Sequence, residues 1–170
     1  KEYRRQRQMC IRDRLIGNFI ETDARVLDLG CGDGSLLAFL KSNNKVKGLG
    51  LEINHQKIQE CLQRDVNVID QDIDSGLSNF QDQSFDAVIM SQSIQALRKP
   101  EVALEEITRI GKEAIISIPN FANWRCRLQL IFGGTMPVSS ALPHDWYSTP
   151  NIHLCSCLLY TSPSPRDGLL

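Results

Sequence analysis

Three glycines at alternate positions separate a short apolar run from a segment with helical apolar spacing. Residues 26–34 read VLDLGCGDG, so a predicted buried strand leads directly into Gly30, Gly32 and Gly34. Glycine adopts positive φ angles without a steric cost, and a helix beginning near Ser35 would direct free N–H groups toward a ligand. The pattern therefore predicts a loop that binds a nucleotide-type cofactor.

The glycine spacing and the neighbouring acids indicate which cofactor this is. The dinucleotide pattern G-x-G-x-x-G would place its third glycine at position 35, which is Ser35 here, so NAD is disfavoured. Asp28 and Asp33 flank the loop. Two carboxylates suit a ligand with an ammonium and a sulfonium group better than one with a pyrophosphate. We therefore expect S-adenosylmethionine (SAM).

Polar residues also follow the other predicted strands, where ligands of parallel sheets collect. Glu52 could accept hydrogen bonds from two ribose hydroxyls, and Asp72 could accept one from an adenine amino group while Ile73 packs on the ring. Asp28 could order the methionyl ammonium. Each acid has an alternative role as a helix cap or a solvated turn residue. The predicted cofactor-binding residues are Asp28, Gly30, Cys31, Gly32, Gly34, Glu52, Asp72, Ile73 and Ser91.

The signals for a metal and for catalysis are weaker. The D-x-D-x-D run at 70–74 lacks the Gly and Glu of a calcium loop, since Ser75 and Gln81 occupy those positions, and we expect no metal. His144 and His153 lie in a segment expected to cover the cofactor, and either is a candidate base. Histidines in such places are more often hydrogen-bonding loop residues. The catalytic residues are therefore left unassigned.

Alternating strand and helix patterns predict an α/β fold with a mostly parallel sheet and helices on both faces. The expected strands are 25–29, 46–52, 66–69, 85–90 and 114–118. The expected helices are 35–41, one capped by Asn54 with inward Ile58, Cys61 and Leu62, and one from Pro100 with inward Leu104, Ile107 and Ile110. Residues 70–84 are expected to form a loop, and 124–131 an amphipathic helix that serves either as core or as a docking face.

Composition and chain ends bound the class of protein. The chain of 170 residues is 42% hydrophobic and 23% charged, with a net charge of -1. We expect a cytoplasmic protein without nucleic-acid or membrane partners, because no basic excess or long apolar run is present. Residues 1–14 and 156–170 differ abruptly from the middle and look like adapter-derived, non-native tails around one domain at 15–155. The alternative is that they are disordered native tails.

Several motifs together resemble the class I SAM-dependent methyltransferases. They are the glycine loop, Gly-Leu-Glu at 50–52, Gln-Asp at 71–72 and SFDAV at 84–88. A narrower set, at 90–97, 118–130, 134–138 and 142–155, is similar to the MetW proteins of methionine biosynthesis. The resemblance implies a Rossmann-like class I methyltransferase fold, SAM as cofactor, and a bacterial cytoplasmic protein that works with homoserine O-acyltransferase. It also implies a C-terminal antiparallel strand pair, which we expect to be missing here.

Two functions stay open at this point. The fourth strand ends in Met90-Ser91-Gln92, and the chain has neither the Asn/Asp-Pro-Pro-aromatic run of base methylation nor a Pro-Cys nucleophile. The lack of a clear base favours a SAM-binding partner that supports or regulates homoserine acylation. The intact cofactor motif favours the alternative, a SAM-dependent small-molecule methyltransferase with an unidentified acceptor. Whether the protein is an enzyme is left open.

Overall fold

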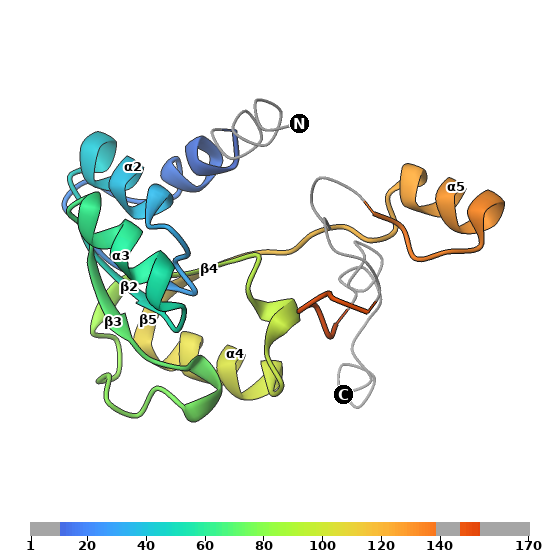
Figure 1. Ribbon diagram of the computed structural model, residues 1–170. Helices are drawn as coiled ribbons and strands as arrows, with labels where there is room; N and C mark the ends of the chain where they lie inside the picture. Colours follow the sequence, from blue (N-terminus) through green and yellow to red (C-terminus); the bar gives the residue numbers. More distant parts are fainter. Residues whose placement is uncertain (1–10, 139–146, 154–170) are drawn as a thin grey trace, which may run out of the picture. The chain divides into compact units, whose positions relative to one another are not determined.

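The computed structural model describes residues 11–138 and 147–153 (Figure 1). In this part of the chain, five strands form one sheet in the order β3-β2-β1-β4-β5, and every neighbouring pair is parallel. The strands are β1 (Arg25–Leu29), β2 (Lys47–Glu52), β3 (Asn67–Asp70), β4 (Phe85–Ser91) and β5 (Gly111–Ser117). The predicted α/β fold with a parallel sheet is confirmed. Among the described residues the sheet ends at β5.

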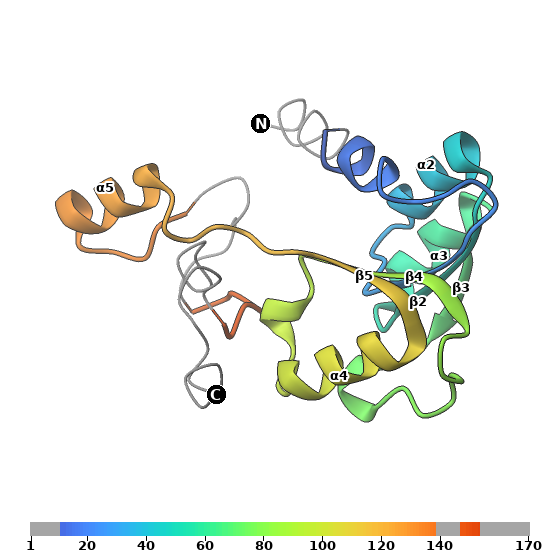
Figure 2. The same ribbon diagram turned by 180° about the vertical axis from the view of Figure 1, so that it is seen from behind.

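Helices cover both faces of the sheet, as predicted. The helices are α2 (Ser35–Asn44), α3 (His55–Gln63), α4 (Pro100–Ile110) and α5 (Trp124–Gly133), with short 3-10 helices η1 (Ile73–Ser75) and η2 (Ile94–Ala96). Residues 11–17 are also helical. Figures 1 and 2 show α2 and α3 over one face of the sheet and α4 over the other. No helix in the described ranges is long and apolar enough to cross a membrane.

The chain divides into two compact units after Ser117. The first unit contains the sheet, α2, α3 and α4, and the second begins at Ile118 and contains α5. The helix expected over 124–131 is therefore present, and within it only Cys126 is buried.

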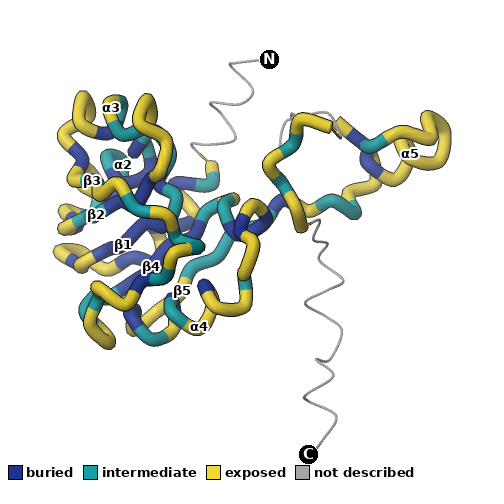
Figure 3. Tube along the Cα trace, turned by 60° about the horizontal axis from the view of Figure 1, so that its bottom comes forward, coloured by how far each residue is buried: buried dark blue, intermediate teal, exposed yellow. Residues whose placement is uncertain are grey.

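The central strands β1 and β4 carry the core. Val26 and Leu27 of β1 and Val88 and Ile89 of β4 are completely buried, as Figure 3 shows for the middle of the sheet. This confirms that β4 is buried on both faces, which its unbroken apolar run predicts. From α2, the predicted residues Leu36, Leu37 and Leu40 are buried, whereas Phe39 is only half-buried.

Two predicted inward residues face solvent instead. Leu62 of α3 is 62% exposed, because α3 lies at the edge of the sheet over the short strand β3 and buries only Cys61. Leu104 of α4 is 37% exposed, and Ala103 takes the inner position beside Ile107 and Ile110. Both predictions were wrong because helical spacing shows which side of a helix is apolar but not how much of that side is buried.

Two boundaries also differ from the prediction. Strand β5 begins at Gly111, three residues before the expected start at 114, because α4 leads into it without a loop. A Cβ atom at Gly111 would lie 2.6 Å from Val88 Cγ2, so a larger residue could not make this transition. Helix α2, predicted to end at residue 41, continues to Asn44. Lys45 ends it with a φ of 57°.

Arg109 of α4 anchors the crossover between β3 and β4. Residues 70–84 were predicted to be a loop, but they contain the short helix η1. This crossover contains no other helix. The Arg109 guanidinium donates to the carbonyl oxygens of Phe80 (2.8 Å) and Leu77 (3.1 Å), and it pairs with Glu106 (2.8 Å) and Asp82 (2.7 Å). Leu77 is fully buried beneath it. Hydrogen bonds and ion pairs of one side chain therefore join this crossover to α4.

We expect Arg109→Met to lower the free energy of unfolding by roughly 1–3 kcal/mol, because the substitution removes the donor to the Phe80 carbonyl and leaves the Leu77 carbonyl with only the Phe80 N–H. Chemical denaturation of the full chain measures this. Arg127→Met on α5 is the matched control, since Arg127 is exposed, and a change within about 0.5 kcal/mol is expected there. Equal losses in the two variants would contradict the anchoring role.

Candidate functional site

The predicted glycine loop adopts the backbone conformation that its sequence requires. Gly30, Gly32 and Gly34 have φ angles of 74°, 61° and 73°. The loop follows β1, the central strand, at the point where the chain has β2 on one side and β4 on the other. In open α/β sheets this topological switch point is where ligands bind. Glycine is therefore needed here for its conformation, as predicted.

Gly30 is also needed because another segment packs directly on it. A Cβ atom at Gly30 would lie 2.9 Å from Ser93 Cβ, and the Ser93 hydroxyl donates to the Leu29 carbonyl oxygen at 2.8 Å. The segment after β4 is thereby joined to the end of β1. Ser93 was not predicted as a site residue, because no local pattern links positions 64 residues apart.

Gly32, in contrast, borders open space. A Cβ atom there would meet nothing within 4 Å. The Gly32 N–H donates to Glu52 Oε2 at 2.9 Å, and its carbonyl oxygen accepts from the Cys61 thiol at 3.2 Å. Glu52 and Cys61 thus hold the backbone of the loop, while the Cα of Gly32 faces open space that a ligand could occupy.

Glu52 holds the loop to the end of β2. Its Oε1 accepts the N–H groups of Ile53 and Asn54, both at 3.0 Å, and its Oε2 accepts that of Gly32. The side chain is almost fully buried. Since each carboxylate oxygen can accept two hydrogen bonds, Oε2 keeps capacity for the ribose hydroxyl that we predict. The loop contact of Glu52 was not predicted.

Asp28 is the most unusual group at the site. It is 2% exposed, and its Oδ1 has no hydrogen-bond partner among the described residues. The pKa of Asp28 is raised to about 7, chiefly by burial; the Arg12 guanidinium lowers it, and the carboxylates of Asp13 and Glu52 contribute to the rise. Arg12 and Asp13 lie within residues 1–14, which we assigned to a non-native tail. A buried carboxylate without a partner is costly unless a ligand supplies a donor.

The other predicted cofactor-binding residues have varied surroundings. Ile73 is half-buried, and its Cδ1 lies 4.0 Å from the position of a Cβ at Gly30. Asp72 is exposed and caps η1 by accepting the Asp74 N–H at 3.0 Å, the alternative role noted above. The Ser91 hydroxyl hydrogen-bonds that of Ser117 at 2.9 Å. Their contacts with a cofactor stay predictions.

The Cys31 side chain points into the core. Its Sγ lies 3.8 Å from Cys61 Sγ, both thiols are buried, and burial raises the pKa of each. A Cβ at Gly50 would lie 2.5 Å from Cys31 Sγ, so the thiol fills space that this glycine leaves. Any contact of Cys31 with a cofactor would involve its backbone.

The residues considered as metal ligands or as a base have the following surroundings. No group of His, Cys, Asp and Glu in the described ranges could hold a metal ion. Asp74 instead accepts the backbone N–H groups of Arg98 (3.1 Å) and Lys99 (3.3 Å). His153 is exposed. His144 lies outside the described residues.

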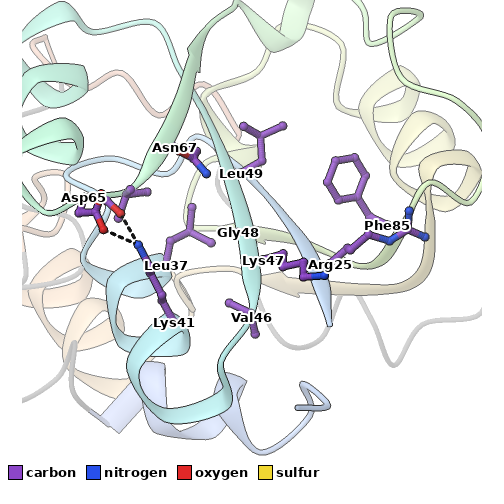
Figure 4. Close-up of a pocket in the computed structure, with 11 residues that line it drawn as sticks. Arg25, Leu37, Lys41, Val46, Lys47, Gly48, Leu49, Asp65, Asn67 and Phe85 are labelled. Atoms are coloured by element: carbon purple, nitrogen blue, oxygen red, sulfur yellow. Dashed lines mark hydrogen bonds and ion pairs between the residues drawn. The ribbon is translucent and has the colours of Figure 1, made fainter. Parts of the chain in front are cut away.

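A cavity of about 410 Å³ lies at the opposite edge of the sheet (Figure 4). The first residues of four strands line it, namely Arg25, Lys47, Asn67 and Phe85. In its wall the Lys41 ammonium contacts the Asp65 carboxylate at 2.6 Å. Because the glycine loop follows the carboxyl end of β1, this cavity is separate from the candidate site.

Comparison with known proteins identifies the family. The family model for the methionine biosynthesis protein MetW matches residues 12–162. This chain belongs to the MetW family. A bifunctional methionine biosynthesis protein MetXA/MetW from Rhodopirellula baltica is 36% identical over 141 residues, which are 78% of this chain. The chain spans only 23% of the length of that relative.

Two solved structures with a similar fold are described as SAM-dependent methyltransferases. One from Archaeoglobus fulgidus matches with a TM-score of 0.63 and 22% identity, over 78% of this chain and 62% of that protein. One from Thermotoga maritima, described as a possible histamine N-methyltransferase, has a TM-score of 0.56 and 25% identity, over 69% of this chain and 55% of that protein. The MetW chain thus has the Rossmann-like class I methyltransferase fold that its motifs predict.

Asp28→Asn tests the cost of the buried carboxylate. Because the pKa of Asp28 is about 7 in the folded protein and 3.8 ordinarily, the folded state binds a proton more tightly than the unfolded chain. Its contribution to stability therefore falls as the pH rises from about 4 to about 7, by up to roughly 4 kcal/mol. We expect the melting temperature of Asp28→Asn to exceed that of the wild type at pH 8, with a smaller difference at pH 5.

Scanning calorimetry at the two pH values measures this difference. Asp23→Asn is the matched control, because Asp23 is exposed, and the difference between this variant and the wild type should not change with pH. If the difference between Asp28→Asn and the wild type were the same at both pH values, the raised pKa would be wrong.

Proposed function

We propose that this chain binds SAM at the glycine loop and supports homoserine O-acyltransferase in methionine biosynthesis in the cytoplasm. The observation that carries the proposal is the unpartnered Oδ1 of buried Asp28, in the strand β1 that leads directly into the glycine loop. This oxygen needs a donor, preferably a cationic one. The ammonium of SAM provides such a group.

The surrounding residues fit the rest of the molecule. Glu52 Oε2 retains acceptor capacity for a ribose hydroxyl, and Ile73, near Gly30, offers an apolar surface to the adenine. Asp28 and Glu52 border the loop and favour a cationic ligand, whereas Asp33 is paired with Arg64 at 3.1 Å. The pyrophosphate of NAD would be repelled by the same acids. When bound, SAM would supply an activated methyl group.

The proposed partner is supported by the relative from Rhodopirellula baltica. Its name describes one bifunctional protein, MetXA/MetW, in methionine biosynthesis. Two functions in one chain remain at a fixed ratio and a high effective concentration. We infer that the present chain likewise works with a homoserine O-acyltransferase, and that SAM, a downstream product of methionine, acts there as a signal.

Gly32→Ala tests the cofactor site. The added methyl group would enter the open space beside the loop without touching other protein atoms. We expect the full wild-type chain to bind SAM in isothermal titration calorimetry, and Gly32→Ala to bind it about tenfold more weakly or worse, the equivalent of ~1.4 kcal/mol. NADH should not bind.

Gly134→Ala is the matched control for this test. Gly134 has a φ of 62° and, like Gly32, nothing within 4 Å of a Cβ atom. The two substitutions therefore carry a similar backbone strain, but only one lies at the loop. SAM affinity should be unchanged in Gly134→Ala. A wild-type chain that is folded by circular dichroism and does not bind SAM would exclude the proposed site.

The partner is tested separately with purified homoserine O-acyltransferase. We expect the two proteins to elute together in size-exclusion chromatography and the acyl-transfer rate to change by about twofold or more when the chain is added. Gly32→Ala should still form the complex but should no longer make the rate respond to SAM. Separate elution together with an unchanged rate would rule out the partnership.

A further inference from the structure

The segment after β4 contains a buried amide that lacks one hydrogen bond. Gln95, in η2, is 4% exposed, and its Nε2 donates to the Gln92 carbonyl oxygen at 2.7 Å. Its Oε1 is buried and has no partner among the residues that the structure describes. Buried polar atoms are rarely left in this state, and functional sites are where such exceptions occur.

The backbone of the same segment is strained. Gln92 has a φ of 59°, a region that costs a residue with a side chain about 1–2 kcal/mol. Its N–H donates to the Ser117 carbonyl oxygen at 2.9 Å, which holds this conformation at the end of β5. Strain that the surroundings maintain and an unpaired buried acceptor therefore occur within four residues.

This segment belongs to the same edge of the sheet as Asp28. Strands β1 and β4 pair directly, with Asp28 opposite Ile89, and Ser93 contacts both Leu29 and Gly30. Three buried side-chain atoms lack partners in the described ranges, and Asp28 Oδ1 and Gln95 Oε1 are two of them. The third, Ser84 Oγ, comes just before the start of β4, at the other edge.

Both unpaired atoms at this edge are acceptors. A ligand in contact with both atoms would have to bring hydrogen-bond donors or positive charge at two places. SAM has two positive centres, an ammonium and a sulfonium. If the ammonium is assigned to Asp28, the sulfonium remains as the second centre.

We infer that Gln95 makes the site prefer SAM to its demethylated product, S-adenosylhomocysteine. The inference rests on the proposed function, since it assumes that SAM binds at the loop. The two ligands differ by one methyl group and one positive charge at sulfur. An amide oxygen stabilises the positively polarised methyl of a sulfonium through C–H···O contacts, and a neutral thioether offers no equivalent. Gln95 is then the residue that makes the affinity depend on whether the ligand carries the methyl group.

Substitution of Gln95 tests this through the ratio of two affinities. Gln95→Met keeps the size of the side chain and removes the oxygen, so the preference for SAM over S-adenosylhomocysteine should fall roughly two- to fivefold. Gln95→Glu keeps an acceptor and adds negative charge, so the preference should rise, and more at high pH, where the carboxyl is ionised. Calorimetry with both ligands on the full chain gives the ratio.

The control and the outcomes separate this inference from the proposed function. Gln63→Met on α3 is the matched substitution, because Gln63 is exposed, and should leave the ratio unchanged. If the folded wild type binds neither ligand, the proposed function fails and the inference fails with it. If the wild type binds both ligands, and Gln95→Met and Gln95→Glu have the same affinity ratio as the wild type, the inference alone is wrong. Equal weakening of both ligands in Gln95→Met would mean that Gln95 is only structural.

Discussion

The hydrogen bonds between Glu52 and three backbone N–H groups are the constraint on which the site depends. They join the end of β2 to the glycine loop, and the N–H groups of Gly30 and Cys31 add two bonds of 2.9 Å to the Leu51 carbonyl oxygen. The conformation of the loop is therefore fixed by hydrogen bonds within the chain itself. A ligand that binds a preformed loop does not lose free energy in ordering it, which favours affinity.

The same preformed edge leaves other groups unsatisfied. Asp28 Oδ1 and Gln95 Oε1 lack partners in the described part of the chain, and Gln92 is held at a positive φ. The well-packed centre of the sheet, where the middle residues of β1 and β4 are buried, keeps them in place. Stability is thus concentrated in the core and lowered at the carboxyl edge, as expected where a site is complementary to a ligand rather than to itself.

Sequence patterns predicted the framework better than its contacts. The unbroken apolar run of β4 and the glycine spacing after β1 each reflect a strong local requirement, so the strand and the positive φ angles were predicted correctly. The predicted burial of Leu62 and Leu104 was wrong because burial depends on which part of the sheet a helix covers. Ser93, Cys61 and the loop contact of Glu52 join segments distant in the sequence, and neither periodicity nor spacing carries that information. Gln95 stood within a motif, but nothing local showed that its amide is buried.

The burial of Asp28 has a consequence for how long the protein survives in a cell. A carboxyl group whose pKa is raised to about 7 makes the ligand-free chain less stable at neutral pH than it would otherwise be. Proteases degrade the unfolded fraction, and any ligand that binds only the folded form reduces that fraction in proportion to its concentration. A cation that paired with Asp28 would therefore slow degradation, and the amount of protein would follow the supply of that cation without any change in synthesis.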